Sequence, residues 1–262
     1  MMGKKDSDKY IDELQIEKID KRSVKIKRKE DRDAVAGVLD TRTLFTLNAL
    51  LNKGIIESLV GIISAGKEAN VYLGYYKNHI EIAIKVYKID KQIAKWMNEY
   101  LIGDPRFSRL KNNIRYIINA WAKKEFKNLK RARLNGIPVP NPIAVKDNVL
   151  IMEFIGMQGT PAPRLKEIEI KGDINFYYHQ MIQIIKDLYK KAHLVHADLS
   201  EFNILYWQEK LTVIDMSQSV LSDHPKARYY LARDIKNINL YFQKKGIQVI
   251  PPDVIYEEVI QN

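Results

Sequence analysis

The sequence predicts an α+β protein in which a β-rich lobe precedes an α-rich lobe. Strand-like patterns dominate from residue 55 to 154, interrupted by one long helical pattern, and helical periodicity dominates after residue 173. The length of 262 residues and the hydrophobic content of 46% suit one domain with a sizeable core. We expect three parts: a charged, mobile N-terminal arm over residues 1–33, an N-terminal lobe over 34–155 and a C-terminal lobe over 156–262.

The N-terminal lobe is predicted to begin with a helix and an antiparallel meander. Leucines recur at helical spacing within residues 35–59, and Asn52-Lys53-Gly54 is typical of a helix end. Strand patterns follow over 55–63, 71–75 and 80–87, with a small-residue tip between the first two.

In the second half of that lobe, residues that break helices and strands mark the predicted element ends. Residues 90–112 are polar and contain Gly103-Asp104-Pro105, so we expect a long loop with partial helix. Residues 114–134 show the clearest helical pattern in the chain, which ends at Asn135-Gly136. Strand patterns return over residues 142–154.

The C-terminal lobe is predicted to be mainly helical. Asp173 can cap a helix whose apolar face includes Phe176 and Met181. A short hairpin and two final helices follow, over residues 204–207 with 211–214, then 225–244 and 252–259.

Bulk composition excludes several classes of protein. No apolar run approaches 18 residues and the charged N-terminus has no signal-peptide core, so we expect a cytoplasmic protein without a membrane partner. The absence of cysteine excludes disulfides and thiolate metal sites. The net charge of +11 indicates either a polyanionic partner or simply a lysine-rich surface.

The most informative segment is the loop over residues 194–203. Asp198 and Asn203 lie five residues apart between a long helix and a short hairpin, and Asp215 follows the hairpin. Such an aspartate can accept a hydroxyl proton, while carboxylate and amide oxygens suit Mg²⁺. The alternative is that Asp198 and Asn203 only cap turns.

A lysine and a glutamate occupy positions where burial requires a partner. Lys85 interrupts the apolar strand pattern, and Glu125 lies on the apolar stripe of the long helix. Each could neutralise the other, and a lysine held in this way can reach nucleotide phosphates. Alternatively, Lys85 extends to solvent and Glu125 lies at the edge of the stripe.

The tip between the first two strands could bind phosphate. Small residues over 64–70 allow backbone N–H groups to approach an anion, and Ser64 and Lys67 add donors. The segment is not a Walker P-loop, and an ordinary hairpin turn explains it equally well.

In this order, the pieces resemble a protein kinase with altered motifs, and specifically the type-1 branch of the RIO family of atypical serine/threonine kinases. The matching strings are AGKEANVY at 65–72, LVHADLSEFN at 194–203 and IDMSQSV at 214–220. The resemblance implies a protein-kinase-like bilobal fold with a reduced C-lobe that lacks a full activation segment. It also implies ATP and Mg²⁺ as cofactors, with Mn²⁺ as a substitute.

The resemblance implies roles for particular residues. The catalytic residues are Asp198, Asp215 and Lys85, and the magnesium ligands are Asn203 and Asp215. The hinge at 152–155 would bind adenine through the backbone of Glu153 and Ile155, and Glu125 would orient Lys85. The remaining nucleotide-binding residues are Ser64, Ala65, Gly66, Lys67, Glu68, Ala69, Asn70 and Val71.

The implied function is a kinase or ATPase in small-ribosomal-subunit maturation, in which Asp215 could carry phosphate transiently. The partners would be pre-ribosomal protein and rRNA, with a serine or threonine of another protein or of this chain as acceptor. Two alternatives stay open. One is a nucleotide-switched, non-catalytic assembly factor, and the other is a small-molecule phosphotransferase of the aminoglycoside type.

Overall fold

The computed structural model describes residues 39–107, 113–169 and 172–261. The predicted arm over residues 1–33 lies outside the described residues, as does the first part of the predicted helical segment 35–59. The described part of that segment forms helix α3 (Thr41–Asn52), which Asp40 caps, and the strand that follows begins at Ser58.

A five-stranded antiparallel sheet is the framework of the N-terminal lobe. Its strands lie in the order β1-β2-β3-β5-β4, so the predicted meander is confirmed and the later hairpin extends it. The strands are β1 (Ser58–Ala65), β2 (Ala69–Tyr76), β3 (Ile80–Tyr87), β4 (Pro142–Lys146) and β5 (Val149–Glu153).

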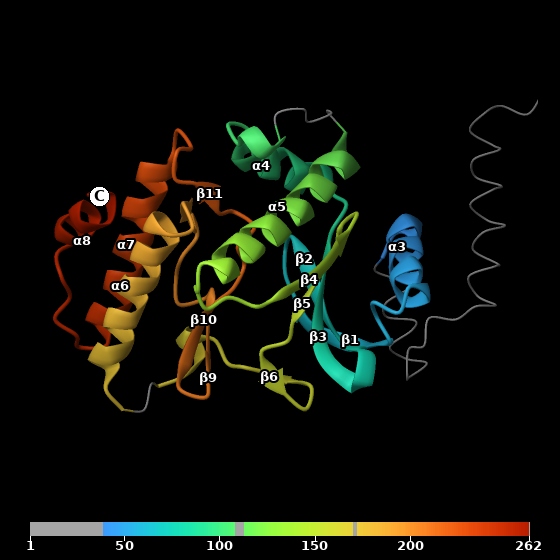
Figure 1. The fold of residues 1–262 in the computed structure, drawn as a ribbon, viewed down its shortest axis with the longest axis horizontal. Coiled ribbons are helices and arrows are strands. Elements are labelled where there is room, and N and C mark those ends of the chain that lie inside the picture. Colours follow the sequence, from blue (N-terminus) through green and yellow to red (C-terminus); the bar gives the residue numbers. More distant parts are fainter. Residues whose placement is uncertain (1–38, 108–112, 170–171, 262) are drawn as a thin grey trace, which may run out of the picture.

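Alternation along β3 divides the lobe into two environments. Ile82, Ile84 and Val86 pack with the leucines of α3 in one apolar cluster. The intervening side chains project to the opposite face, where Lys85 meets helix α5 (Ile114–Leu134). The predicted bounds of α5 are confirmed, and the helix lies between the sheet and the helices of the C-terminal lobe (Figure 1).

The partial helix expected within the long loop over residues 90–112 is confirmed, and it occupies the first half of that segment. Helix α4 (Lys91–Leu101) begins after the cap Asp90 and is followed by a 3₁₀ turn over Pro105–Phe107, while residues 108–112 are outside the described part. The polar composition hid a narrow apolar stripe, Ala94, Met97 and Leu101, which packs toward α5.

Three helices form the C-terminal lobe and lie together on one side of the molecule (Figure 1). Phe176 does not belong to the apolar face predicted for the first of them, because its side chain is exposed. Among the described residues, no helix is long and apolar enough to span a membrane. The helices are α6 (Ile174–Lys190), α7 (Ala227–Lys244) and α8 (Pro252–Ile260).

Four short two-residue strands and one hairpin complete the fold. The hairpin of β9 and β10 carries the segment between Asn203 and Asp215, and the predicted lobe boundary at residue 155 falls between β5 and β6. These strands are β6 (Gly156–Met157), β7 (Thr160–Pro161), β8 (Leu194–Val195), β9 (Ile204–Trp207), β10 (Lys210–Val213) and β11 (Val220–Leu221).

Candidate active site

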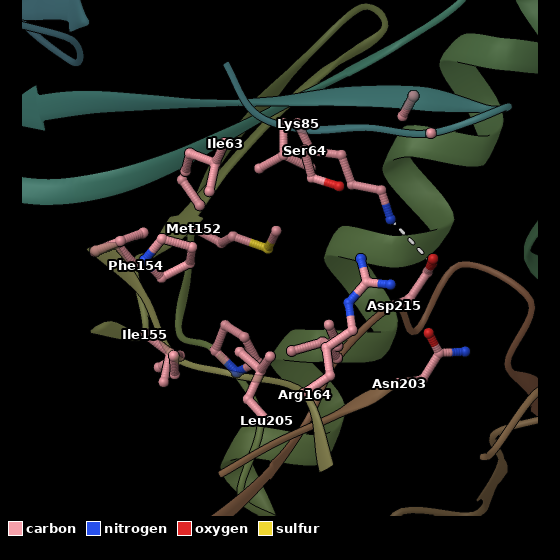
Figure 2. A pocket seen from close by; sticks show the side chains of 18 of the residues that line it. Ile63, Ser64, Lys85, Met152, Phe154, Ile155, Arg164, Asn203, Leu205 and Asp215 are labelled. Carbon is pink, nitrogen blue, oxygen red and sulfur yellow. Dashed lines mark hydrogen bonds and ion pairs between the residues drawn. The ribbon is translucent and has the colours of Figure 1, made fainter. Parts of the chain in front are cut away.

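A cavity of about 510 Å³ opens between the sheet and the C-terminal lobe, and strands of both lobes line it (Figure 2). Its walls come from the tip between β1 and β2, from β3, from the segment after β5 and from the β9–β10 hairpin with its flanks. The lining residues predicted from the sequence are Ser64, Gly66, Lys67, Glu68, Ala69, Val71, Lys85, Glu153, Ile155, Asn203 and Asp215.

Four predicted site residues do not line this cavity. Glu125 lies behind Lys85, and Asp198 lies beside Asn203, so both remain connected to the lining. Ala65 is an exposed residue at the end of β1, and Asn70 is buried in β2 with no hydrogen-bond partner for its Oδ1 within the described structure.

A cluster of three charges connects the sheet, α5 and the segment after β10. Lys85 Nζ lies 3.0 Å from Glu125 Oε1 and 2.9 Å from Asp215 Oδ1, so the pair predicted from the sequence forms and gains a second carboxylate. Glu125 also accepts a short hydrogen bond from the Tyr87 hydroxyl. Every charge in the cluster therefore has an opposite charge or a donor beside it.

Burial and pairing act in opposite directions on the pKa values of this cluster. Burial alone would lower the pKa of Lys85, but the carboxylates of Asp215 and Glu125 raise it above its usual range. Burial alone would raise the pKa of Asp215, but the Lys85 ammonium and the Ser217 hydroxyl lower it to about 2. At neutral pH, Asp215 is thus an anion and Lys85 a cation.

Asp198 is held in a defined orientation. Its Oδ2 accepts hydrogen bonds from Asn203 Nδ2 at 3.2 Å and from Gln218 Nε2 at 3.0 Å. Burial and the nearby Asp215 carboxylate raise the pKa of Asp198 above its usual value. A carboxylate with a raised pKa is a better proton acceptor than an ordinary aspartate.

Two side chains of α7 hold the backbone of the loop that carries Asp198. Asp234 accepts the N–H groups of Ala197 and Leu199 at 2.8 and 3.0 Å, and Arg233 donates to the Ala197 carbonyl. These contacts hold Ala197 in a left-handed conformation, with φ of 64°. Asp234 was missed from the sequence, although its place among apolar residues of α7 is the same signal that identified Glu125.

His196 supports the loop rather than acting as a base. Burial lowers the pKa of His196 to about 4, so its imidazole is neutral at neutral pH. Nε2 lies 3.0 Å from the Ile214 carbonyl and must donate, while Nδ1 accepts the Asp198 N–H at 3.2 Å. The imidazole of His196 thereby links the backbone at Asp198 with the backbone at Ile214, next to Asp215.

Two further side chains of α5 hold the segment after Asp215. Lys124 Nζ donates to the carbonyls of Ser217 and Ser219 at 2.8 and 2.6 Å, and Asn128 Nδ2 donates to Met216 and Ser219. Asp215 itself has a φ of 59°, a left-handed conformation that an unsupported aspartate rarely keeps. Burial lowers the pKa of Lys124 to about 7.

The tip between β1 and β2 is closed by its own backbone. The Gly66 N–H donates to the Ala69 carbonyl at 2.9 Å, and Lys88 Nζ donates to the Gly66 carbonyl at 2.6 Å. Burial, together with the Asp215 carboxylate, raises the pKa of Glu68 to about 7. The tip therefore places a titrating carboxyl in the wall of the cavity.

The comparison with known proteins decides the family. The RIO domain model matches residues 70–255, which begin at the end of the tip and include the strand lysine, the helix glutamate and both aspartates. The chain belongs to the RIO family. Relatives named RIO1, at about 40% identity, confirm the resemblance to the type-1 branch.

Three of these RIO relatives show the range of the match. The serine/threonine-protein kinases RIO1 of Saccharomyces cerevisiae and Homo sapiens are each 42% identical over 90% of this chain, which covers 54% and 42% of their lengths. The RIO-type serine/threonine-protein kinase Rio1 of Haloferax volcanii is 36% identical over 85% of this chain and 76% of its own. The chain thus spans about half the length of the first two relatives.

Solved RIO structures confirm the fold. The Rio2 kinase from Chaetomium thermophilum aligns with a TM-score of 0.66 and 25% identity, over 83% of this chain and 66% of that one. Its ADP/Mg²⁺-phosphoaspartate complex aligns with the same TM-score at 23% identity, over 83% and 65%. The predicted bilobal, kinase-like α+β fold is therefore confirmed.

Replacing Lys124 with methionine tests the support that α5 gives to the segment after Asp215. The Ser219 carbonyl would keep its bond from Asn128, whereas the buried Ser217 carbonyl would lose the Lys124 donor. We expect Lys124→Met to lower the free energy of unfolding by about 1–3 kcal/mol, measured by urea denaturation. Lys123→Met, an exposed neighbour, should change it little, and equal stabilities of the two variants would contradict this assignment.

Proposed function

We propose that this chain is an ATP- and Mg²⁺-dependent serine/threonine protein kinase that also hydrolyses ATP. The observation that carries the proposal is the buried contact of Lys85 with both Glu125 and Asp215 at the wall of a cavity of nucleotide size. The printed names of the RIO1 relatives, which are serine/threonine-protein kinases, support the same activity.

Adenine would bind at the segment after β5. The Glu153 N–H already donates to the Asn141 carbonyl, and the Ile155 carbonyl already accepts the Ala162 N–H. The groups left for adenine are therefore the Glu153 carbonyl and the Ile155 N–H, an acceptor and a donor as the adenine edge requires. Met152 and Phe154 supply apolar surface around this end of the cavity (Figure 2).

The donor set fits Mg²⁺. Asn203 uses its Nδ2 to hold Asp198, which leaves the amide oxygen for a cation, and Asp215 is an anion at neutral pH. Among the described residues, no three His, Cys, Asp or Glu side chains gather closely enough to form a metal site. Two protein oxygens completed by phosphates and water are the usual environment of Mg²⁺, which neutralises phosphate charge when bound; Mn²⁺ could replace it.

Two acceptors for the γ-phosphoryl group follow from the roles of the aspartates. In protein phosphorylation, Asp198 orients a serine or threonine hydroxyl and accepts its proton. In ATP hydrolysis, an Asp215 oxygen could attack the γ-phosphorus as the bond to the β-phosphate bridging oxygen breaks, giving ADP and an acyl phosphate that water then cleaves. The phosphoaspartate named in the Rio2 complex supports this second route.

Asp198→Asn and Asp215→Asn test both routes while keeping the side-chain shape. We expect ATP hydrolysis and autophosphorylation with Mg²⁺ to fall by about a hundredfold or more, because each variant removes a charged group at the reacting phosphate. Asp253→Asn, at an exposed position of α8, is the matched control. If the wild-type chain is incubated with ATP labelled in its γ-phosphate, label on the chain that hydroxylamine removes indicates an acyl phosphate. Full activity in both variants would refute the assigned mechanism.

Glu68→Gln tests the titrating carboxyl in the cavity wall. Above pH 7, Glu68 is ionised and repels nucleotide phosphates, whereas below pH 7 it is neutral like glutamine. We therefore expect the variant to bind ADP about three- to tenfold more tightly at pH 8.5, and the two affinities to converge near pH 6. Calorimetry without Mg²⁺ measures both, and a ratio that stays constant with pH would count against this role.

We further propose a cytoplasmic role in small-ribosomal-subunit maturation, with pre-ribosomal protein and rRNA as partners. The net charge of +11 favours a polyanionic partner, and the resemblance to the type-1 branch favours this one. Co-sedimentation with small-subunit precursors tests this proposal. If ATP releases the wild-type chain from the precursors but does not release the Asp198→Asn variant, ATP turnover drives the release. Release by ATP in the inactive variant as well would favour the non-catalytic assembly factor.

A further inference from the structure

Arg164 lines the nucleotide cavity from the wall opposite the sheet, and no sequence motif identified it. Figure 2 shows its side chain extending into the cavity toward the end where Lys85 and Asp215 lie, away from Ile155. No carboxylate of the described residues forms an ion pair with its guanidinium, since Arg164 bonds to Glu167 through its backbone groups.

The backbone of Arg164 is fixed, so the side chain starts from a defined point. Its N–H donates to Glu167 Oε2 at 3.0 Å, and its carbonyl accepts the Glu167 N–H at 2.9 Å. It also pairs with Leu205 of β9 in an antiparallel bridge. The connector that carries Arg164 is therefore held beside the hairpin that leads from Asn203 to Asp215.

The cations that line the cavity differ in how far each is free to bind an anionic ligand. Lys67, Lys85 and Arg164 line it together with the carboxyls of Glu68, Glu153, Glu167 and Asp215. Lys85 is shared between two carboxylates, and Lys67 is exposed at the tip. Arg164 is the partly buried cation of this lining without a carboxylate partner, and guanidinium matches phosphate oxygens with two parallel hydrogen bonds.

We propose that Arg164 binds the phosphate oxygens of the nucleotide, from the wall opposite Lys85. The inference rests on the proposed function, because it takes a nucleotide as the occupant of this cavity. The phosphates are its target rather than adenine, since the guanidinium extends toward Lys85 and Asp215 (Figure 2). Arg164 then adds a second cation for the phosphates, because the charge of Lys85 is shared with Glu125 and Asp215.

Calorimetric titration of the full chain with adenosine, ADP and ATP, without divalent metal, tests this role. For Arg164→Leu we expect about a tenfold loss of affinity for ADP and ATP, with the affinity for adenosine unchanged. Arg164→Lys should retain part of the affinity, because lysine keeps the positive charge but cannot donate two parallel hydrogen bonds. Lys166→Leu, which removes an exposed neighbouring cation that stacks on Phe202, is the control for net charge.

Each other outcome would overturn the assignment. An equal loss for adenosine would show that Arg164 only packs against the nucleoside, and unchanged ADP binding would show that it makes no contact. Tighter ADP binding by Arg164→Leu would show that the side chain obstructs the cavity. A wild-type chain that binds none of the three ligands would refute the proposed function as well, whereas normal wild-type binding with an unaffected variant refutes only this inference.

Discussion

The buried contact of Lys85 with Glu125 and Asp215 is the interaction on which the site depends. It joins the sheet, α5 and the segment after β10, which come from three distant parts of the sequence. An isolated charge at this depth would be unstable, and removing one partner of a buried ion pair typically costs about 3–5 kcal/mol. The cluster is thus both a structural connection between the lobes and the place where phosphate charge would be received.

Helix α5 contacts the sheet on one side and the segment after Asp215 on the other. Glu125 reaches toward the sheet, while Lys124 and Asn128 reach toward the backbone that follows Asp215. Asn128 in turn accepts a hydrogen bond from Arg106, which is paired with the buried Asp104 before the segment outside the described residues. The position of α5, the conformation of Asp215 and the turn over 105–107 are therefore coupled through direct contacts.

The sequence predicted the residues whose chemistry conflicts with their apolar surroundings. Lys85 and Glu125 were recognisable because a charge interrupted an apolar pattern, and the bounds of α5 followed from its caps and breakers. Lys124 and Arg164 were not recognisable, because a lysine next to a buried glutamate and an arginine in a connector look like ordinary surface cations. Their burial and direction depend on how distant segments meet, which periodicity does not encode.

Helix α4 shows the same limit at the level of secondary structure. Its polar composition predicted a long loop with only partial helix and did not give the bounds of that helix. One narrow apolar stripe is enough to stabilise it, because the stripe packs against α5. The two aspartates proposed to be catalytic differ in pKa because their surroundings differ. The Lys85 ammonium keeps Asp215 ionised, whereas burial and the Asp215 carboxylate raise the pKa of Asp198.

A crystal structure of the chain with Mg²⁺ and a non-hydrolysable ATP analogue tests this account most directly. We predict one Mg²⁺ bound by Asn203 Oδ1 and Asp215, with Lys85 contacting the phosphates while it still holds Glu125. A nucleotide bound outside the cavity, or a metal bound without Asn203 and Asp215, would contradict it.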